Sequence, residues 1–312
     1  MVVSGPILIT GAAGRVGGVG RALVEGLRRR GVAVRALVRV DDARAAALRA
    51  MGAEVVVGDL TNTVDVARAL SGCRRAYLGL SVSPDYLEAT AVFAAVARET
   101  ANLDMLVNMS QMTVSQMNLQ ATTDSHQQRL HWLAEQVLNW SGLPVVHVRP
   151  TVFLEHPFFL NWAADSIARD GTLRLPFGAA RTSPISVRDV VEAIETILVG
   201  DAASRVGKVF ELIGPCSLDM NEIASEYAVV LGRPVKYVDE PFEQWQAREV
   251  YGDASKMTEQ SDHLKNHMIT MAKLHAAGRY DRLSRDFEVV TGKMPRTVRQ
   301  FVEENKARFG AA

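Results

Sequence analysis

The sequence predicts an α/β fold: a doubly wound parallel sheet of the Rossmann type with a smaller, mainly helical C-terminal lobe. Short apolar runs alternate with helix-like segments through the first half of the 312-residue chain, which is typical of βαβ units. A glycine-rich turn follows the first apolar run directly. From Pro150 onward the alternation becomes irregular and richer in aromatic residues. We therefore expect a first domain over residues 1–150 and a substrate-facing lobe over residues 151–312.

The expected elements follow the alternation in order. Strands are expected at 6–10, 32–38, 54–57, 74–80, 104–110 and 143–150, and helices at 21–30, 43–51 and 64–70, with longer helical stretches between the later strands. Right-handed crossovers between such strands give a parallel sheet that is covered on both faces. Late strands are expected at 207–214 and 233–241, and residues from about 183 to 215 are expected to return to the first sheet.

Composition and charge exclude several classes of protein. The 35 acidic residues balance the 35 basic residues, so no global field attracts nucleic acid or an anionic membrane. Cys73 and Cys216 match no metal or redox spacing and are expected to be reduced thiols. The chain shows no signal-peptide pattern and no apolar run of the roughly 18 residues that span a bilayer. We expect a cytoplasmic protein, and a homodimer is an assembly that the sequence allows.

The glycine-rich segment at Ile9–Gly20, ITGAAGRVGGVG, predicts a nucleotide site. Gly11, Gly14 and Gly17 have the spacing G-x-x-G-x-x-G between an expected strand and an expected helix. Glycines there allow a tight turn and close approach of a pyrophosphate, which the helix N-terminus attracts. The shifted register Gly14-Gly17-Gly20 has the same spacing and leaves open which glycine packs against the sheet.

The end of the second strand is expected to read the adenosine ribose. Val38 lies where a carboxylate would favour NAD, and Arg39 follows it. An arginine there suits a 2′-phosphate, and Arg15 in the glycine loop would add a second positive charge. Asp41 and Asp42 are alternative ribose contacts. We therefore expect NADPH as the cofactor, with NADH as the alternative.

The chain resembles the NmrA-like, atypical branch of the short-chain dehydrogenase/reductase superfamily. The segments that support this resemblance follow the family's order and approximate spacing: ITGAAGRVG, VRALVR, VVVGDL, LVNMSQM, HWLAEQVLNWSGLPVVHVRP, SPISVRDVVEAI and TGKMPRTVRQFV. Together with the glycine loop and the second strand, the resemblance implies that the cofactor contacts Thr10, Gly11, Ala13, Gly14, Arg15, Val16, Gly17, Arg39, Asp59, Leu60, Leu80, Ser81, Ser110 and His131.

The resemblance also implies where catalysis takes place. Ser110 would occupy the place of the superfamily's active-site serine, although a strand-end cap is the alternative. Typical members carry Tyr-x-x-x-Lys with a glutamate four residues beyond the lysine. Here Glu135 matches that glutamate, which puts Gln127 at the tyrosine position and His131 at the lysine position. Some quinone- and dye-reducing members have histidine there, so His131 would bind the nicotinamide ribose or donate a proton, with a purely structural histidine as the alternative.

The missing tyrosine restricts the chemistry. Reduction of an aliphatic ketone produces a strongly basic alkoxide, which requires a well-placed acid. Reduction of a quinone produces a phenolate, whose conjugate acid has a pKa of roughly 10, near that of tyrosine. A site without the tyrosine therefore suits conjugated electron acceptors.

Aromatic residues gather in the segment Thr151–Trp162, TVFLEHPFFLNW. We expect Phe153, His156, Phe158, Phe159 and Trp162 to contact a small aromatic substrate by stacking, with ordinary packing between the lobes as the alternative for each ring.

A metal site is not expected. His263 and His267 have helical i, i+4 spacing, and His275 follows, but HExxH is absent and no third ligand is evident. A solvated helix face is the expected role of these histidines.

Three functions remain from the sequence. The leading hypothesis is an NAD(P)H-dependent reductase that transfers hydride to a planar conjugated acceptor, a quinone or a related aromatic compound. The alternatives are a non-catalytic NAD(P)-sensing regulator and an auxiliary protein in aromatic natural-product modification.

Overall fold

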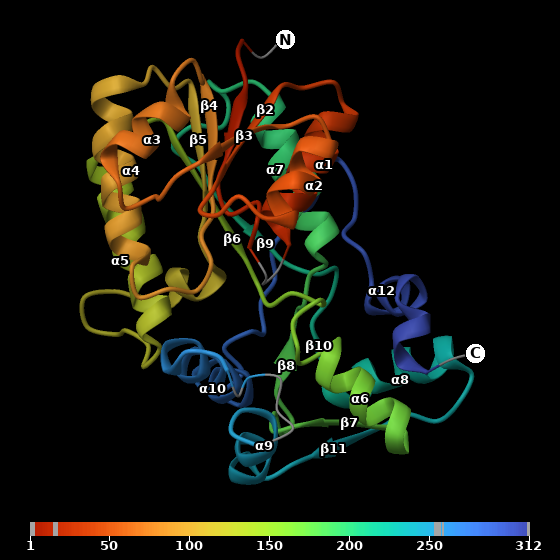
Figure 1. Ribbon diagram of the computed structural model, residues 1–312. Coiled ribbons are helices and arrows are strands. Elements are labelled where there is room, and N and C mark those ends of the chain that lie inside the picture. Colours follow the sequence, from red (N-terminus) through yellow and green to blue (C-terminus); the bar gives the residue numbers. More distant parts are fainter. Residues whose placement is uncertain (1–3, 15–17, 253–256, 258, 311–312) are drawn as a thin grey trace.

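The computed structural model describes residues 4–14, 18–252, 257 and 259–310, and its arrangement is the predicted doubly wound sheet with a smaller second lobe (Figure 1). Within these residues the main sheet has seven parallel strands in the order β3-β2-β1-β4-β5-β6-β9. They are β1 (Ile7–Ile9), β2 (Val34–Val38), β3 (Glu54–Val57), β4 (Arg75–Leu78), β5 (Met105–Met109), β6 (Val145–Pro150) and β9 (Val209–Leu212). The predicted strand at 207–214 is therefore the edge strand beside β6.

Helices cover both faces of this sheet (Figure 1). One core lies under α1 (Val19–Arg29), α2 (Ala43–Ala50), α7 (Val187–Val199) and α11 (Asp286–Thr291). The core of the opposite face lies under α3 (Thr63–Leu70), α4 (Tyr86–Thr100) and α5 (His126–Trp140). A short 3-10 helix, η1 (Met112–Gln116), follows β5. Because both faces are covered, the strands are apolar along most of their length.

The second lobe has its own apolar core. It contains α6 (Asn161–Asp170), α8 (Met220–Leu231), α9 (Phe242–Glu249), α10 (Asp262–Ala276), α12 (Val298–Glu304) and η2 (Lys306–Phe309). Two short sheets accompany the helices: β7 (Thr172–Leu175) with β11 (Lys236–Asp239), and β8 (Arg181–Thr182) with β10 (Leu218–Asp219). The predicted strand at 233–241 is thus β11, which pairs outside the main sheet.

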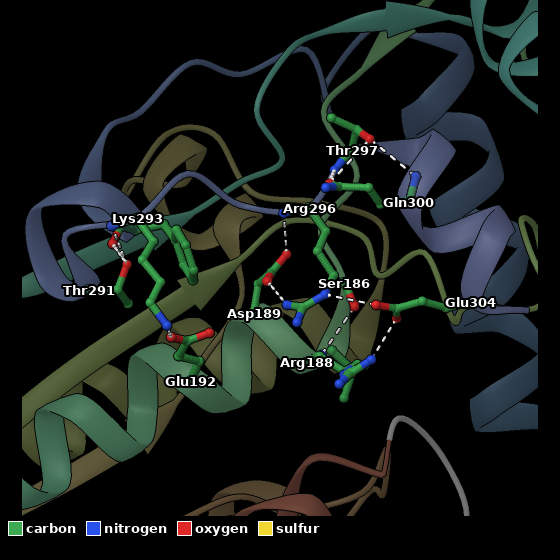
Figure 2. Close-up of polar contacts among 12 residues, drawn as sticks. Ser186, Arg188, Asp189, Glu192, Thr291, Lys293, Arg296, Thr297, Gln300 and Glu304 are labelled. Atoms are coloured by element: carbon green, nitrogen blue, oxygen red, sulfur yellow. Dashed lines mark hydrogen bonds and ion pairs between the residues drawn. The ribbon is translucent and has the colours of Figure 1, made fainter.

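Polar contacts join the C-terminal segment to α7, as Figure 2 shows. Asp189 accepts a hydrogen bond of 2.7 Å from the backbone N–H of Arg296 and pairs with the Arg296 guanidinium. Lys293 pairs with Glu192, and Arg296 also contacts Glu304 at 3.3 Å. Because Asp189 is nearly fully buried, this contact fixes the segment between α11 and α12 against the sheet domain.

The glycine-rich turn brings three backbone segments together. Gly11 has φ +68°, and a Cβ on it would lie 2.5 Å from the carbonyl oxygen of Gly79. Helix α1 begins at Val19, two residues before the predicted start, and a Cβ on Gly20 would lie 2.8 Å from the carbonyl carbon of Gly11. Gly20 therefore packs the helix directly against the turn, whereas Gly17 lies outside the described residues.

Cys73 is buried and Cys216 is exposed, and both are free thiols. Over the part of the chain that the structure describes, no helix has the length and apolarity needed to cross a membrane.

We predict that Gly20→Ala destabilises the protein. The added methyl group meets backbone atoms that cannot rotate away, and such overpacking costs roughly 1–3 kcal/mol, more than the roughly 1 kcal/mol by which alanine favours a helix over glycine. Urea unfolding measures the change. Arg21→Ala, at the exposed position next to Gly20 in helix α1, is the control. Unchanged stability of Gly20→Ala would show that α1 does not press on the turn.

Candidate active site

The candidate site begins where the sheet order reverses, at the carboxyl ends of β1 and β4. The buried Thr10 hydroxyl donates a hydrogen bond to the Gly79 carbonyl oxygen at 2.8 Å and accepts one from the Gly79 N–H at 2.9 Å. Ligands of doubly wound sheets bind in the crevice at this point. The Thr10 side chain thus links the carboxyl ends of β1 and β4.

A larger cavity of about 700 Å³ opens on the β2 side of this point. Eight of the residues predicted to bind the cofactor line it: Gly11, Ala13, Gly14, Arg39, Asp59, Leu60, Leu80 and Ser81. The loop from the end of β1, the end of β2 and the end of β3 therefore contribute together, as expected at one edge of a parallel sheet. Arg15, Val16 and Gly17 lie outside the described residues.

Five charged residues line the larger cavity: Arg39, Arg44, Asp59, Asp85 and Glu88. Asp59 accepts hydrogen bonds of 2.8 Å from both the N–H and the hydroxyl of Thr61, and these bonds, with nearby Arg39, hold the pKa of Asp59 below its usual range. Arg39 itself is exposed. Arg44, which the sequence reasoning missed, donates a 2.8 Å hydrogen bond to the Ala13 carbonyl oxygen. Arg44 also pairs with Asp42 at 2.5 Å, so an ion pair lies beside the glycine-rich turn.

A smaller cavity of about 220 Å³ continues from the larger one toward the second lobe. Both cavities are lined by Gly11, Gly79, Leu80, Ser81, Val82 and Leu264. The smaller cavity also brings together four predicted residues, Ser110, His131, Phe153 and His156. Thr10 reaches it as well. The two cavities thus form one continuous site along the carboxyl edge of the sheet.

Two predicted residues present unpartnered polar atoms in the smaller cavity. The Ser110 hydroxyl is buried, and it has no hydrogen-bond partner among the described residues. The same holds for Nδ1 of His131, whose ring contacts the Tyr86 ring at a centroid distance of 4.2 Å. Burial lowers the pKa of His131 to about 3. The imidazole is therefore neutral near pH 7.

Gln127 and Glu135, on the same helix as His131, are engaged in structural contacts. The Gln127 side-chain oxygen accepts hydrogen bonds from the Ser83 N–H at 3.2 Å and from Nε2 of His263 at 2.8 Å. Glu135 accepts a 3.0 Å hydrogen bond from Nε of Arg149 on β6. The position expected for the family's tyrosine therefore joins α5 to α10 and to the loop after β4.

The histidines of α10 do not form a solvated face, which corrects that expectation. His267 is buried, and its Nδ1 lies 2.9 Å from the hydroxyl of Ser125, the N-cap of α5. His275 is buried between the rings of Phe177 and Tyr280. The buried apolar residues of α10 belong to the core of the second lobe, so both histidine rings contact protein in place of water. Within the described chain, no cluster of three or more metal-ligating side chains occurs.

Three of the five predicted substrate contacts lie elsewhere. Phe158, Phe159 and Trp162 belong to the core of the second lobe and do not line either cavity. Phe158 packs against Trp245 and Phe177. The segment after β6 lines the cavity as far as Pro157, so only its first part reaches the cavity.

Other lining residues come from segments that the sequence reasoning did not connect to the site. Leu264, His267, Met268 and Met271 of α10 line the smaller cavity, and their i, i+3, i+4, i+7 spacing is a signal that periodicity could have found. Glu155 also lines it, and its carboxylate accepts hydrogen bonds from the Ser186 hydroxyl at 2.9 Å and the Val187 N–H at 2.8 Å.

Comparisons with known proteins agree with this site. The family model described as NAD(P)H-binding matches residues 11–194. The NAD(P)H azoreductase of Xenophilus azovorans is 28% identical over 308 residues, which cover 98% of this chain and 100% of the relative. The triphenylmethane reductase of Citrobacter sp., solved with NADP(H), has a TM-score of 0.80 at 17% identity and covers 96% of this chain and 99% of its own.

A second similar structure is that of a regulatory protein. The negative transcriptional regulator NmrA, solved with NADP, has a TM-score of 0.77 at 16% identity, with 96% of this chain and 95% of that chain covered. Fold and site together define a Rossmann-type nucleotide-binding protein. The chain belongs to the NAD(P)H-binding family. It is an NAD(P)H-dependent oxidoreductase.

The buried histidines make the stability depend on pH. Burial lowers the pKa of His275 to about 3 and that of His267 to about 4, whereas histidine in an unfolded chain has a pKa near 6.5. Between about pH 6.5 and pH 4 the unfolded state binds more protons than the folded state. The free energy of unfolding therefore falls as the pH is lowered through this window.

We predict that each of these two histidines removes roughly 2 kcal/mol of stability between pH 7 and pH 5. His275→Phe keeps a planar ring in the stack, so this variant should lose about 2 kcal/mol less than the wild type over that range. Urea unfolding at both pH values gives the difference. His126→Gln replaces an exposed histidine and should follow the wild type. If the free energy of unfolding had the same pH dependence in the wild type and in His275→Phe, His275 would bind its proton as readily in the folded state as in the unfolded state.

Proposed function

We propose that this protein is an NADPH-dependent reductase of planar conjugated acceptors, quinones or related aromatic compounds. The observation that supports this most is the continuity of the two cavities across the ends of β1 and β4. One cavity has the charges and the glycines that a dinucleotide requires. The other is mainly apolar and is lined by neutral polar groups near Ser110 and His131.

The residues present fit a dinucleotide. The positive φ of Gly11 and the close contact of Gly20 with it keep side chains away from the turn, which leaves room for a pyrophosphate beside the start of α1. The adenosine half would lie in the larger cavity near Asp59 and Leu60. The exposed Arg39 in the lining of this cavity favours a cofactor with a 2′-phosphate, hence NADPH over NADH.

The nicotinamide half would lie at the junction of the cavities. When bound, it supplies the hydride. The free Ser110 hydroxyl and the unpartnered nitrogen of His131 are then available to bind the carboxamide or ribose groups. Because the His131 ring is neutral, it acts as a hydrogen-bonding group with no charge of its own. Leu264, Met268 and Met271 exclude water from the acceptor.

The nature of the acceptor follows from the missing acid. Gln127 replaces the family's tyrosine and is engaged by His263 and Ser83. A quinone-type acceptor gives a weakly basic product and needs little help from an acid. Flexible methionine side chains in the cavity wall suit planar rings of different outline.

Steady-state assays test this proposal directly. Purified protein should oxidise NADPH with menadione, with an azo dye or with a cationic triphenylmethane dye as acceptor. A sensor like NmrA would bind NADPH or NADP⁺ in calorimetry and consume none with any acceptor in the panel. Absence of both binding and turnover would contradict the reductase and the sensor alike.

Cofactor choice gives a further prediction. Arg39→Ala should weaken NADPH binding by about 1.5–3 kcal/mol, the value of a hydrogen bond to a charged group, and should leave NADH nearly unchanged. Calorimetric titration with both cofactors measures the two effects. Arg49→Ala, which removes an arginine paired with Asp41 outside the cavity, is the matched control. Equal losses for NADPH and NADH would remove Arg39 from the phosphate site.

A further inference from the structure

The smaller cavity contains a phenol that comes from a distant segment of the chain. Tyr280 follows α10 and lies 153 residues beyond Gln127, the expected tyrosine position. It lines the cavity together with Ser110 and His131. Its side chain is 3% exposed. The structure thus supplies a hydroxyl where the sequence motif lacks one.

The ring of Tyr280 is fixed by stacking. It lies on the His275 ring at a centroid distance of 3.9 Å and an interplanar angle of 16°. The other face of His275 lies on Phe177 at 4.4 Å and 10°. A ring held in a three-member stack keeps its hydroxyl in one direction, because rotation about either side-chain bond would break the stack.

The backbone around Tyr280 is fixed as well. The Ser183 N–H donates to the Tyr280 carbonyl oxygen at 3.0 Å, and the Ser183 hydroxyl donates to that of Arg282 at 2.6 Å. The Gln116 side-chain N–H donates to the Arg279 carbonyl oxygen at 2.8 Å. Residues 279–282 are therefore tied both to the lead into α7 and to η1, which follows β5 and Ser110.

The hydroxyl itself is available as a donor. It accepts a long hydrogen bond of 3.4 Å from the side-chain N–H of Gln128. Among the described residues the Tyr280 hydroxyl donates to no acceptor, and the side-chain oxygen of Gln128 beside it also has no partner. Burial raises the pKa of Tyr280, so the phenol remains protonated throughout the working range of pH.

We propose that the Tyr280 hydroxyl donates a hydrogen bond to the carbonyl oxygen of a quinone-type acceptor and stabilises the negative charge that develops on that oxygen during hydride transfer. This inference rests on the proposed reductase function. It assigns to Tyr280 the stabilisation of charge, without transfer of its proton, so the phenol is unchanged at the end of the reaction.

Charge considerations favour this role over simple wall packing. Within the described lining of the smaller cavity there is no lysine or arginine, and Glu155 is the one charged side chain. Burial also lowers the pKa of His131, His156 and His267. Negative charge on an acceptor oxygen must therefore be stabilised by neutral donors, and a rigidly held phenol costs little to reorganise.

The role can be separated from packing by the choice of acceptor. Hydride addition to menadione places negative charge on an oxygen. Hydride addition to the cationic dye crystal violet neutralises the central carbon and creates no oxyanion. A group that stabilises an oxyanion therefore matters for menadione and not for the dye, whereas a group that only shapes the cavity matters for both.

The test compares Tyr280→Phe with the wild type on both acceptors, with NADPH as the reductant. Phenylalanine keeps the stack, so the thermal midpoint should stay within a few degrees of the wild-type value. Loss of an oxyanion donor costs roughly 10²–10³-fold where the oxyanion is strongly basic; for a phenolate-like product we expect kcat/KM for menadione to fall about 10- to 100-fold. Crystal violet should change less than about twofold. Tyr251→Phe, at a half-exposed tyrosine outside both cavities, should match the wild type.

A binding measurement keeps this test separate from the proposed function. Calorimetric titration with menadione in the absence of NADPH should show an affinity several-fold weaker for Tyr280→Phe than for wild type. Unchanged kcat/KM for menadione, or equal losses of turnover with menadione and crystal violet, would overturn the role of Tyr280. A wild type that turns over neither acceptor would instead refute the reductase function itself.

Discussion

The site depends on how closely the ends of β1 and β4 approach each other. The Thr10 hydroxyl both donates to and accepts from the Gly79 backbone, and the absence of side chains on Gly11 and Gly20 lets the turn and the start of α1 lie against that pair. Every other part of the site is placed relative to this contact. The larger cavity lies on its β2 side and the smaller on its β5 side, and both share the residues after β4.

The two cavities differ in their electrostatics in a way that suits their proposed occupants. Arg39, Arg44 and Asp59 are charged groups of the larger cavity. In the smaller cavity, burial lowers the pKa of three histidines and raises that of the Tyr280 phenol, so these groups are neutral donors and acceptors. A charged cofactor and an uncharged or cationic aromatic acceptor can therefore bind side by side with little competition for the same groups.

The sequence predicts the sheet domain well because its signals are local. Apolar runs and closing glycines define β3 at 54–57 and place the other strands within a few residues. The glycine turn and the strand ends likewise place Gly14, Asp59 and Ser81 in one cavity.

Tertiary packing decides the remainder. Phe158, Phe159 and Trp162 have the composition of a binding surface, yet the core of the second lobe buries them. Tyr280 has no motif, and hydrogen bonds from Ser183 and Gln116 to residues 279–282 hold it at the cavity. Burial, which no sequence pattern states, also keeps the His131 imidazole neutral.

In the proposed reaction, hydride passes directly from the nicotinamide at the junction of the cavities to an acceptor in the smaller one. Turnover of crystal violet with NADPH dideuterated at C4 tests this most directly, because a C–D bond on the central carbon of the leuco dye does not exchange with water. If transfer is direct, mass spectrometry will find the deuterium in the reduced dye. Reduced dye without deuterium would contradict direct transfer.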